Sequence, residues 1–352
     1  MKSQSIIAYA EPLQARVTDT PVPQGNEVLV RVSHCGVCHS DVHLHDGFFD
    51  LGDGRKLDIS ATHELPLTLG HEIVGEVVAC GPQVSGVTPG ERRVVYPWIG
   101  CGACALCDRG DEHLCNKPRA LGINVDGGFA DHVLVPHSRY LLAFDGIEES
   151  LAGPYMCSGL TAYSALRKVG ELGKGDTLAI VGLGGVGMMG LQFARALYPD
   201  AEIVGADIDD ASLQAALQLG AVRVYNTADK DAGKQLLRDS GGGAAVTIDF
   251  VGAEASLTFA QRSVAKGGKV VIVGLFGGRF SLPIPMFPFR ELTLSGSYVG
   301  SLAHAREMLA LVKTGKVKPI PVERRALERA SESLNDLRAG RIVGRVVLDC
   351  QA

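Results

Sequence analysis

Long apolar runs, an excess of basic residues and internal repeats are all missing from this sequence. Apolar stretches such as Thr177 to Val181 have the length of one strand and are far too short to span a bilayer. The formal net charge is −5, which disfavours nucleic acid and anionic membrane surfaces as partners. The amino-terminal residues form no apolar signal core, so we expect a cytoplasmic protein.

The remaining composition is that of an ordinary globular protein. Hydrophobic residues make up 46% and charged residues 21% of the 352 residues. A chain of this length exceeds one hydrophobic core, which predicts two domains. In a reducing compartment the nine cysteines are expected to be metal ligands or free thiols rather than disulfides.

Candidate metal ligands are concentrated in the stretch from Gly36 to His43. It contains Cys38, and a second cluster, Gly70-His71-Glu72, follows about thirty residues later. We interpret Cys38, His71 and the distant Cys157 as three ligands of one zinc ion. Three protein ligands and one open position are typical of a catalytic rather than a structural zinc.

Polar residues next to these ligands suggest how a proton could move. Ser40 could accept a hydrogen bond from a bound alcohol, and His43 could pass the proton to solvent with the cofactor ribose between them. Asp41 is a candidate to orient the imidazole of His71. Glu72 is either a supporting carboxylate or an occasional extra ligand.

Four further cysteines form the least ambiguous pattern in the chain, Cys101-x-x-Cys104-x-x-Cys107 followed by Cys115. Four closely spaced thiolates predict a closed tetrahedral zinc site with a structural role. An iron–sulfur cluster is the alternative, but no electron-transfer partner domain is visible.

From Asp176 onward, strands alternate with helices, which predicts a doubly wound parallel sheet. The strand Thr177–Val181 leads into the glycine-rich motif of Gly182, Gly184, Gly185, Val186 and Gly187, and a helix follows. The next strand ends at Asp207. A carboxylate there would bind the adenosine ribose and repel a 2′-phosphate, so the pattern favours NAD over NADP.

Other segments have less distinct patterns. We interpret residues 44–65 as a loop over the site and residues 275–289 as an interface or pocket loop. A helix is expected over 326–337, and a last strand is expected at Arg345–Asp349.

The order of these motifs resembles that of the zinc-dependent medium-chain alcohol dehydrogenases over essentially the whole chain. The resemblance implies an α/β protein with a β-rich GroES-like catalytic domain and a Rossmann domain. Residues 1–157 would form the catalytic domain with its zinc lobe, and residues 158–297 the NAD-binding domain. Residues 298–352 would return to the first domain.

The same resemblance implies further contacts. His39 and Arg345 would touch the cofactor pyrophosphate, Val273 and Leu275 would pass the nicotinamide carboxamide, and Trp98 would form a pocket wall. The short chain is similar to family members that are homotetramers. Asp209 and Asp210 stand where some members have a lysine, which puts adenosine contacts on that side in doubt.

The leading hypothesis is an enzyme with two zinc ions per chain that transfers a hydride between a small, apolar primary or secondary alcohol and NAD. One alternative is a polyol or sugar dehydrogenase, although such relatives usually have glutamate in place of the third ligand cysteine. Another is a non-catalytic nucleotide-binding relative, which would have lost ligands that this chain keeps.

Overall fold

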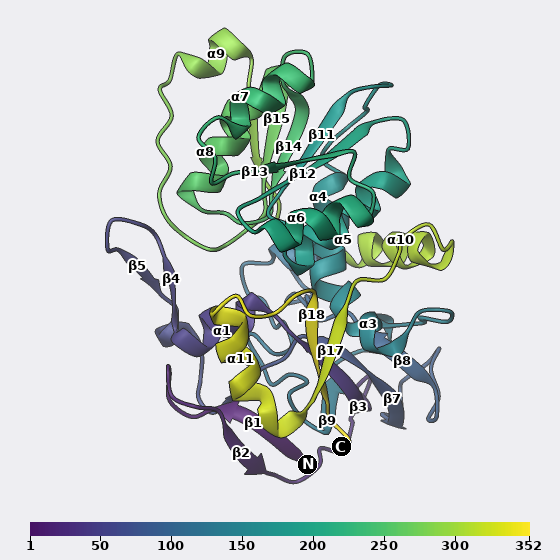
Figure 1. Ribbon diagram of the computed structural model, residues 1–352. Helices are drawn as coiled ribbons and strands as arrows, with labels where there is room; N and C mark the ends of the chain where they lie inside the picture. Colours follow the sequence, from purple (N-terminus) through teal and green to yellow (C-terminus); the bar gives the residue numbers. More distant parts are fainter.

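The computed structural model describes residues 1–352, apart from the side chain of Thr62. Figure 1 shows two bodies, one built around a mixed sheet and the other around a parallel sheet. Among the described residues, none of the helices has the length and apolar character that a membrane crossing would need.

The first body is rich in strands. Its seven-stranded sheet has the order β10-β8-β7-β3-β18-β17, and β9 also pairs with β3. These strands are β3 (Val28–Val37), β7 (Glu72–Cys80), β8 (Arg92–Val95), β9 (His132–Val135), β10 (Leu141–Leu142), β17 (Val322–Ala326) and β18 (Arg345–Asp349). A three-stranded sheet contains β1 (Lys2–Ile6), β2 (Gln14–Val17) and β6 (Leu67–Thr68), and a hairpin joins β4 (Phe48–Asp50) to β5 (Lys56–Asp58).

The second body confirms the predicted doubly wound sheet, with all of its strand pairs parallel and the order β13-β12-β11-β14-β15-β16. Its strands are β11 (Thr177–Val181), β12 (Glu202–Asp207), β13 (Arg223–Asn226), β14 (Ala244–Asp249), β15 (Val264–Ile272) and β16 (Thr293–Gly296). The helices near it are α5 (Gly185–Leu197), α6 (Asp210–Gln218), α7 (Ala232–Asp239), α8 (Glu254–Ser263) and α9 (Met286–Arg290). Every residue of β11 is buried, as expected for a central parallel strand covered on both faces.

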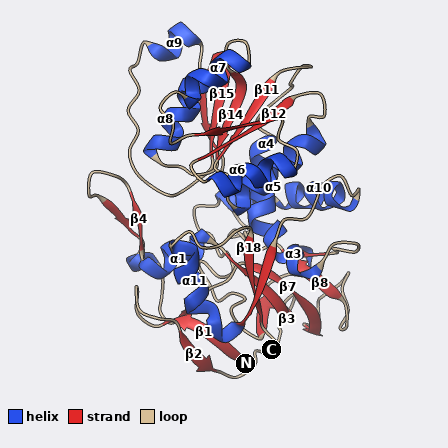
Figure 2. Ribbon diagram, viewed as in Figure 1, coloured by secondary structure: helices blue, strands red, loops and turns tan.

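The remaining helices support the first body or join the two bodies (Figure 2). They are α1 (His39–Asp46), α2 (Ala105–Asp108), α3 (Glu149–Pro154), α4 (Leu160–Leu166), α10 (Leu302–Lys313) and α11 (Ala330–Arg338). Single 3-10 turns lie at Ser60–Thr62, Glu112–Leu114, Ser138–Tyr140 and Leu327–Arg329. One π-helical turn, Tyr155–Gly159, lies between α3 and α4.

Three of the local predictions differ from the structure in their extent. Residues 44–65 are not one loop, because α1 continues to Asp46 and the β4–β5 hairpin follows. The loop expected over residues 275–289 is present up to residue 285, and α9 begins at Met286. The helix expected over 326–337 begins only at Ala330, because β17 occupies Val322–Ala326 and pairs in parallel with β18. The last strand was predicted correctly, at Arg345–Asp349.

The chain returns to its first sheet at its end. Strand β18 pairs antiparallel with β3, with Val346 opposite Val37 and Val347 opposite Gly36. In Figure 1 the yellow β17 and β18 accordingly lie beside the purple β3. The carboxy-terminal strand is thus in register with the residues that lead directly into Cys38.

Candidate active site

Three predicted metal ligands converge from distant parts of the chain. Cys38 precedes α1, His71 precedes β7, and Cys157 lies in the π-helical turn. The Sγ atoms of Cys38 and Cys157 are 3.7 Å apart, and Nε2 of His71 is 3.2 Å from Sγ of Cys157. The ligand atoms of these residues and of Glu72 all lie within 4.8 Å of one another. The structure therefore brings the predicted cluster together.

The local backbone explains this convergence. Strands β3 and β7 are antiparallel neighbours, with Gly36 opposite Glu72, so Cys38 and His71 lie at the same end of the sheet. Cys157 occupies a helical turn with one extra residue, and such turns are frequent at functional sites. The side chains of Cys38, His71 and Cys157 are all buried.

Asp41 supports two of these ligands. Its Oδ1 atom is 3.3 Å from Nδ1 of His71, and its Oδ2 atom accepts a hydrogen bond of 2.8 Å from the backbone N–H of Cys38. Burial opposes a charge on His71, but Asp41 and Cys38 together raise its pKa well above the usual value. The hydrogen bond from Cys157 holds the pKa of Cys38 well below the usual value. A thiolate is the form that binds a metal.

Glu72 and Arg345 form a buried ion pair beside the cluster. Their side chains are 0% and 4% exposed, so neither charge has access to bulk water. Burial raises the pKa of Glu72, while the Arg345 guanidinium opposes that change. Arg345 also lies against Gly185 of the glycine-rich motif. It therefore connects the metal cluster to the predicted cofactor loop.

Aromatic rings surround the cluster on one side. The Trp98 ring lies 5.3 Å from the His71 ring, and its Nε1–H donates a hydrogen bond of 2.8 Å to the carbonyl of Met156. Tyr298 contacts Trp98 edge-on at 6.0 Å. Sequence reasoning missed Tyr298, because it lies far from every motif and no local pattern marks it.

Ser40 and His43 lie one turn apart on α1. The His43 ring packs against Phe49 of β4 at 4.7 Å. Within the described part of the chain, neither the Ser40 hydroxyl nor the His43 ring nitrogens have a hydrogen-bond partner. Burial lowers the pKa of His43, with the charges of Cys38 and Asp46 opposing the change. His43 is thus a neutral base at neutral pH.

The four lobe cysteines form a second cluster, with their ligand atoms also within 4.8 Å of one another. Their Sγ atoms are 3.5 Å apart for Cys104 and Cys107, 3.8 Å for Cys104 and Cys115, and 4.0 Å for Cys101 and Cys107. Backbone N–H groups of Cys101 and Lys117 donate to Sγ of Cys115 and lower its pKa to about 7. This arrangement leaves no open ligand position.

A buried carboxylate attaches this lobe to the 3-10 turn that precedes β10. Oε2 of Glu112 accepts hydrogen bonds from the Gly100 backbone N–H at 3.2 Å and from the Tyr140 hydroxyl at 2.6 Å. Its other oxygen is 3.1 Å from Arg139. Glu112 lies three residues before Cys115, so it couples the cysteine cluster to residues 139–140.

The glycine-rich motif leads from strand β11 into helix α5, as the sequence predicts. Gly182 has a φ of +85°, which a side chain would disfavour. A Cβ atom at Gly187 would overlap the carbonyl oxygen of Gly182, whereas one at Gly184 would meet nothing within 4 Å. The amino terminus of α5 is therefore close to the strand and has open space beside it, where a phosphate could bind.

Asp207 ends β12 beside this motif. Its Oδ2 atom accepts a hydrogen bond of 2.6 Å from the backbone N–H of Leu183. Its Oδ1 atom accepts from the backbone N–H groups of Ile208 and Asp209. Asp207 therefore holds the glycine-rich loop from the neighbouring strand, a role that the sequence analysis did not anticipate.

The three other predicted cofactor contacts differ in exposure. His39 is exposed at the start of α1. Val273 is buried just after β15, and Leu275 is 46% exposed. The backbone N–H groups of Val273 and Gly274 both donate to the carbonyl of Asp249, which fixes the direction of this segment.

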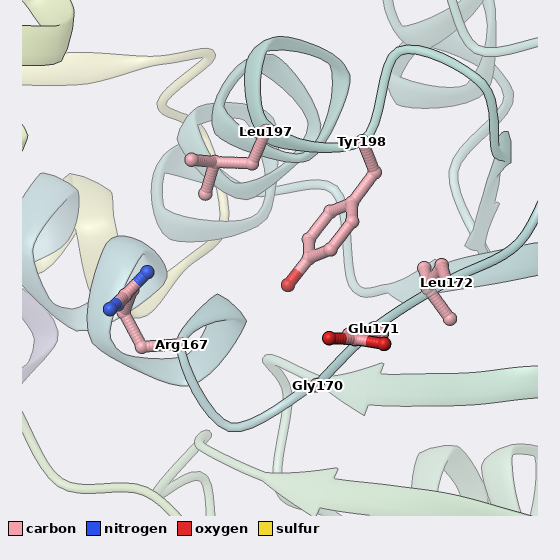
Figure 3. A pocket seen from close by; sticks show the side chains of 6 residues that line it. All are labelled: Arg167, Gly170, Glu171, Leu172, Leu197 and Tyr198. Carbon is pink, nitrogen blue, oxygen red and sulfur yellow. The ribbon is translucent and has the colours of Figure 1, made fainter.

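One surface pocket lies away from the Cys38 cluster. Figure 3 shows this pocket of about 410 Å³, lined by Arg167, Gly170, Glu171, Leu172, Leu197 and Tyr198. It contains none of the candidate ligands, and the Tyr198 hydroxyl donates to the carbonyl of Leu166 at 3.0 Å. The pocket has no cluster of reactive groups, so we place the chemistry at the Cys38 cluster.

The chain is similar to known proteins over nearly its whole length. Residues 24–145 match the alcohol dehydrogenase GroES-like domain, and residues 185–314 match the zinc-binding dehydrogenase domain. An NAD-dependent alcohol dehydrogenase of Sulfurisphaera tokodaii is 38% identical over 350 residues, which is 99% of each chain.

Solved structures agree. The alcohol dehydrogenase of the archaeon Aeropyrum pernix has a TM-score of 0.89 at 31% identity, covering 99% of this chain and 100% of that chain. The D-arabinose dehydrogenase of Sulfolobus solfataricus has a TM-score of 0.84 at 28% identity, covering 99% of each chain.

A doubly wound sheet with a glycine-rich loop, next to a buried cluster of two thiols and an imidazole, defines a zinc-binding dehydrogenase. The chain belongs to the zinc-dependent medium-chain alcohol dehydrogenase family. The predicted family and fold class are confirmed, including the GroES-like and Rossmann parts, and the protein is an enzyme.

Proposed function

We propose that Cys38, His71 and Cys157 hold the catalytic zinc of this NAD-dependent alcohol dehydrogenase. The observation that carries the proposal is the convergence of two sulfurs from residues 119 apart in the chain. Two sulfurs bound at about 2.3 Å to one tetrahedral ion would be about 3.8 Å apart. The Sγ atoms of Cys38 and Cys157 are 3.7 Å apart, so the donor set fits zinc.

We assign a second, structural zinc to Cys101, Cys104, Cys107 and Cys115. Their sulfur separations of 3.5 to 4.0 Å bracket the same expected value. Four thiols leave no position for a substrate, so this site would stabilise the lobe and take no part in the reaction.

The reaction is hydride transfer between an alcohol and NAD, which yields an aldehyde or a ketone. Zinc supplies Lewis acidity toward the substrate oxygen and NAD accepts the hydride. The protein's own part begins with Asp41, which fixes the His71 ring and the Cys38 backbone. Trp98 covers one side of the cluster with an apolar surface and limits access of water.

Ser40 and His43 are proposed as the proton relay. They are three residues apart on α1 and so lie on the same face of the helix. In alcohol oxidation Ser40 would accept a hydrogen bond from the substrate hydroxyl, and the neutral His43 ring would take the proton toward solvent. The unpartnered polar atoms of both side chains within the described residues support this role.

The residues proposed to bind NAD surround the glycine-rich loop. Gly182, Gly184, Gly185, Val186 and Gly187 would hold the pyrophosphate at the start of α5, and Asp207 would hold the ribose. Arg345 and His39 would add positive charge or hydrogen bonds near the phosphates. Val273 and Leu275 would lie along the nicotinamide. The open space at Gly184 and the position of Arg345 against Gly185 support this assignment.

We propose the domain division 1–157, 158–297 and 298–352. Strands β1 to β10 lie in the sheets or hairpin of the first body. Strands β11 to β16 form the parallel sheet, and β17 and β18 join the sheet that contains β3.

For the substrate we favour an apolar primary or secondary alcohol, because Trp98 lies beside the cluster and Phe49 lies beside the relay.

A homotetramer in the cytoplasm is the proposed state of the enzyme. Strand β16 is an edge of its sheet, and Ile284 and Phe289, which precede it in the chain, are 82% and 77% exposed. An unpaired edge with exposed apolar side chains can associate with a second copy. None of the nine cysteines, all of which are among the described residues, forms a disulfide, and this suits a reducing compartment. Sedimentation and mass photometry would measure the number of subunits.

Metal analysis combined with ligand variants tests the site. The wild-type enzyme should contain two zinc ions per chain. Cys38→Ser and His71→Ala should retain about one zinc ion and bind NAD, but lose turnover of alcohols. Cys80→Ser is the matched control, because Cys80 belongs to neither cluster. Intact turnover in Cys38→Ser or His71→Ala would remove that residue from the ligand set.

A further inference from the structure

Tyr298 brings a polar group from the second body to the metal cluster. It follows β16, whereas Trp98 follows β8 of the first body. The Tyr298 ring is 6.0 Å from the Trp98 ring, which in turn is 5.3 Å from the ring of the ligand His71. Tyr298 and the proposed zinc ligand His71 therefore contact the same indole ring.

The backbone around Tyr298 is held in an unusual conformation. Val299 has a φ of +34°, in a region that β-branched residues rarely adopt, and its side chain is 5% exposed. The Ser297 backbone N–H donates to the carbonyl of Ile272 at 2.8 Å. On the other side, the Tyr96 hydroxyl donates to the carbonyl of Gly300 at 2.8 Å. These bonds fix the segment that buries Val299 and directs Tyr298 to Trp98.

The Tyr298 hydroxyl is available to a ligand. Tyr298 is 47% exposed, and its hydroxyl has no hydrogen-bond partner among the described residues. Burial, and after it the negative charges of Cys157 and Cys38, raise the pKa of this hydroxyl. Tyr298 is thus partly exposed and also close enough to Cys157 and Cys38 to respond to their charges. At neutral pH the phenol keeps its proton and can donate a hydrogen bond.

We propose that the Tyr298 hydroxyl binds a second oxygen of the substrate, on the carbon next to the reacting one. The enzyme would then favour vicinal diols and α-hydroxy carbonyl compounds over monoalcohols of the same length. This inference rests on the proposed function of the Cys38 cluster, because it needs a substrate oxygen at that centre. It narrows the alcohols favoured above to those that carry a second oxygen next to the reacting carbon.

The physical reason is the cost of an unpaired donor. A monoalcohol that displaces water from the Tyr298 hydroxyl leaves this donor without a partner, whereas a vicinal oxygen on the substrate replaces the lost hydrogen bond. Ser40 and His43 are already assigned to the reacting oxygen of the substrate. Asp41 contacts His71 and Cys38, and Oε1 of Glu72 contacts Arg345. The preference for vicinal diols over monoalcohols should therefore depend on the side-chain hydroxyl of Tyr298.

Tyr298→Phe tests this with matched pairs of substrates. Butan-1-ol is compared with butane-1,2-diol, and butan-2-ol with butane-2,3-diol, by NADH absorbance. In Tyr298→Phe the diol-to-monoalcohol ratio of kcat/KM should fall about three- to tenfold relative to wild type, the size expected for one neutral hydrogen bond. Values for the monoalcohols should stay equal or rise.

A binding measurement accompanies the kinetics. Butanamide and 2-hydroxybutanamide resemble the carbonyl product but are not reduced, and their affinity for the enzyme–NADH complex is read from NADH fluorescence. The hydroxylated amide should lose about three- to tenfold in affinity in Tyr298→Phe, and the plain amide should not. Tyr198→Phe is the matched control, because that hydroxyl donates to the carbonyl of Leu166 away from the cluster.

The outcomes separate the two proposals. If wild type oxidises the alcohols but both ratios stay within twofold in Tyr298→Phe, the assigned role of Tyr298 is wrong. An equal fall for diols and monoalcohols also overturns it, because that result indicates a packing role. If wild type, loaded with zinc and NAD, turns over none of the four alcohols, the proposed function fails, and the inference fails with it.

Discussion

Nδ1 of His71 lies 3.3 Å from Oδ1 of Asp41, and both side chains are completely buried. The second oxygen of the same carboxylate accepts a hydrogen bond from the backbone of Cys38. One side chain thus positions two of the three proposed zinc ligands. A carboxylate in this place fixes the imidazole tautomer and keeps Nε2 directed at the Cys157 sulfur, 3.2 Å away.

Asp41→Asn should weaken zinc binding at the catalytic site by about 10- to 100-fold, because the neutral amide no longer stabilises the His71 ring. The measurement is competition with a chelator, followed by counting the zinc ions that remain on each chain. One ion, that of the cysteine lobe, should resist removal. Asp145→Asn is the control, since the side chain of Asp145 is 88% exposed. Equal retention of both ions in Asp41→Asn would contradict the role of Asp41.

The sequence alone was sufficient to predict the parts of the site that are built from cysteine and histidine in recognisable motifs. Cysteine and histidine at residues 38 and 71, and the four lobe cysteines, have few roles besides metal binding in such patterns. The glycine-rich loop was predictable for a different reason. Its glycines satisfy backbone constraints at Gly182 and Gly187 that no other residue would meet.

Other parts of the fold and of the site could not be predicted, because they depend on contacts between residues far apart in the chain. Strand β17 has the polar sequence Val322–Ala326 and forms because β18 offers it a parallel neighbour, a tertiary effect that overrides local propensity. Tyr298 reaches the site only because the segment after β16 turns back toward the first body through the strained Val299. Neither feature has a local pattern from which it could be predicted.

Glu112→Gln should loosen the cysteine lobe. The variant loses the ion pair with Arg139 and part of the hydrogen bonding to Gly100 and Tyr140. Disrupting a buried, charge-assisted hydrogen bond typically costs about 1–3 kcal/mol. We expect faster loss of the lobe zinc to a chelator and a lower unfolding midpoint in denaturant. Glu171→Gln should change neither quantity, because Glu171 is an exposed residue outside the lobe. Unchanged zinc release in Glu112→Gln would show that the lobe does not depend on this carboxylate.

Asp207→Gly should weaken NAD binding about 10- to 100-fold and relax discrimination against NADP, because a charged hydrogen-bond acceptor is worth about 1.5–3 kcal/mol. The structure gives a second reason for the loss of NAD affinity, since Asp207 also accepts a hydrogen bond from the Leu183 backbone N–H.

Asp207→Asn separates the effect on the ribose from the effect on the loop. It keeps an acceptor for Leu183 but removes the charge that repels a 2′-phosphate. Dissociation constants for NAD and NADP should show relaxed discrimination in both variants and the larger loss of NAD affinity only in Asp207→Gly. Unchanged cofactor preference in both would argue against the ribose contact.

The proposed relay through Ser40 and His43 makes a prediction about pH. A neutral His43 ring can accept the proton that alcohol oxidation releases, and a protonated ring cannot. Burial lowers the pKa of His43 below its ordinary value of 6.5. The kcat/KM for oxidation should therefore rise with pH and level off above a pKa that lies below 6.5. Carbonyl reduction needs the protonated ring, so its rate should fall over the same pH range.

His43→Ala should remove this titration and lower kcat/KM for oxidation by about 100-fold, the lower end of the effect of a positioned acid or base. Added imidazole should restore part of the rate in His43→Ala, because a small base can reach the place that the ring occupied beside Phe49. His132→Ala is the matched control, since His132 pairs with Asp131 in another part of the fold, and it should keep the wild-type profile. His43→Ala removes the imidazole that packs against Phe49. A wild-type pH profile in this variant would therefore mean that the proton leaves by another route.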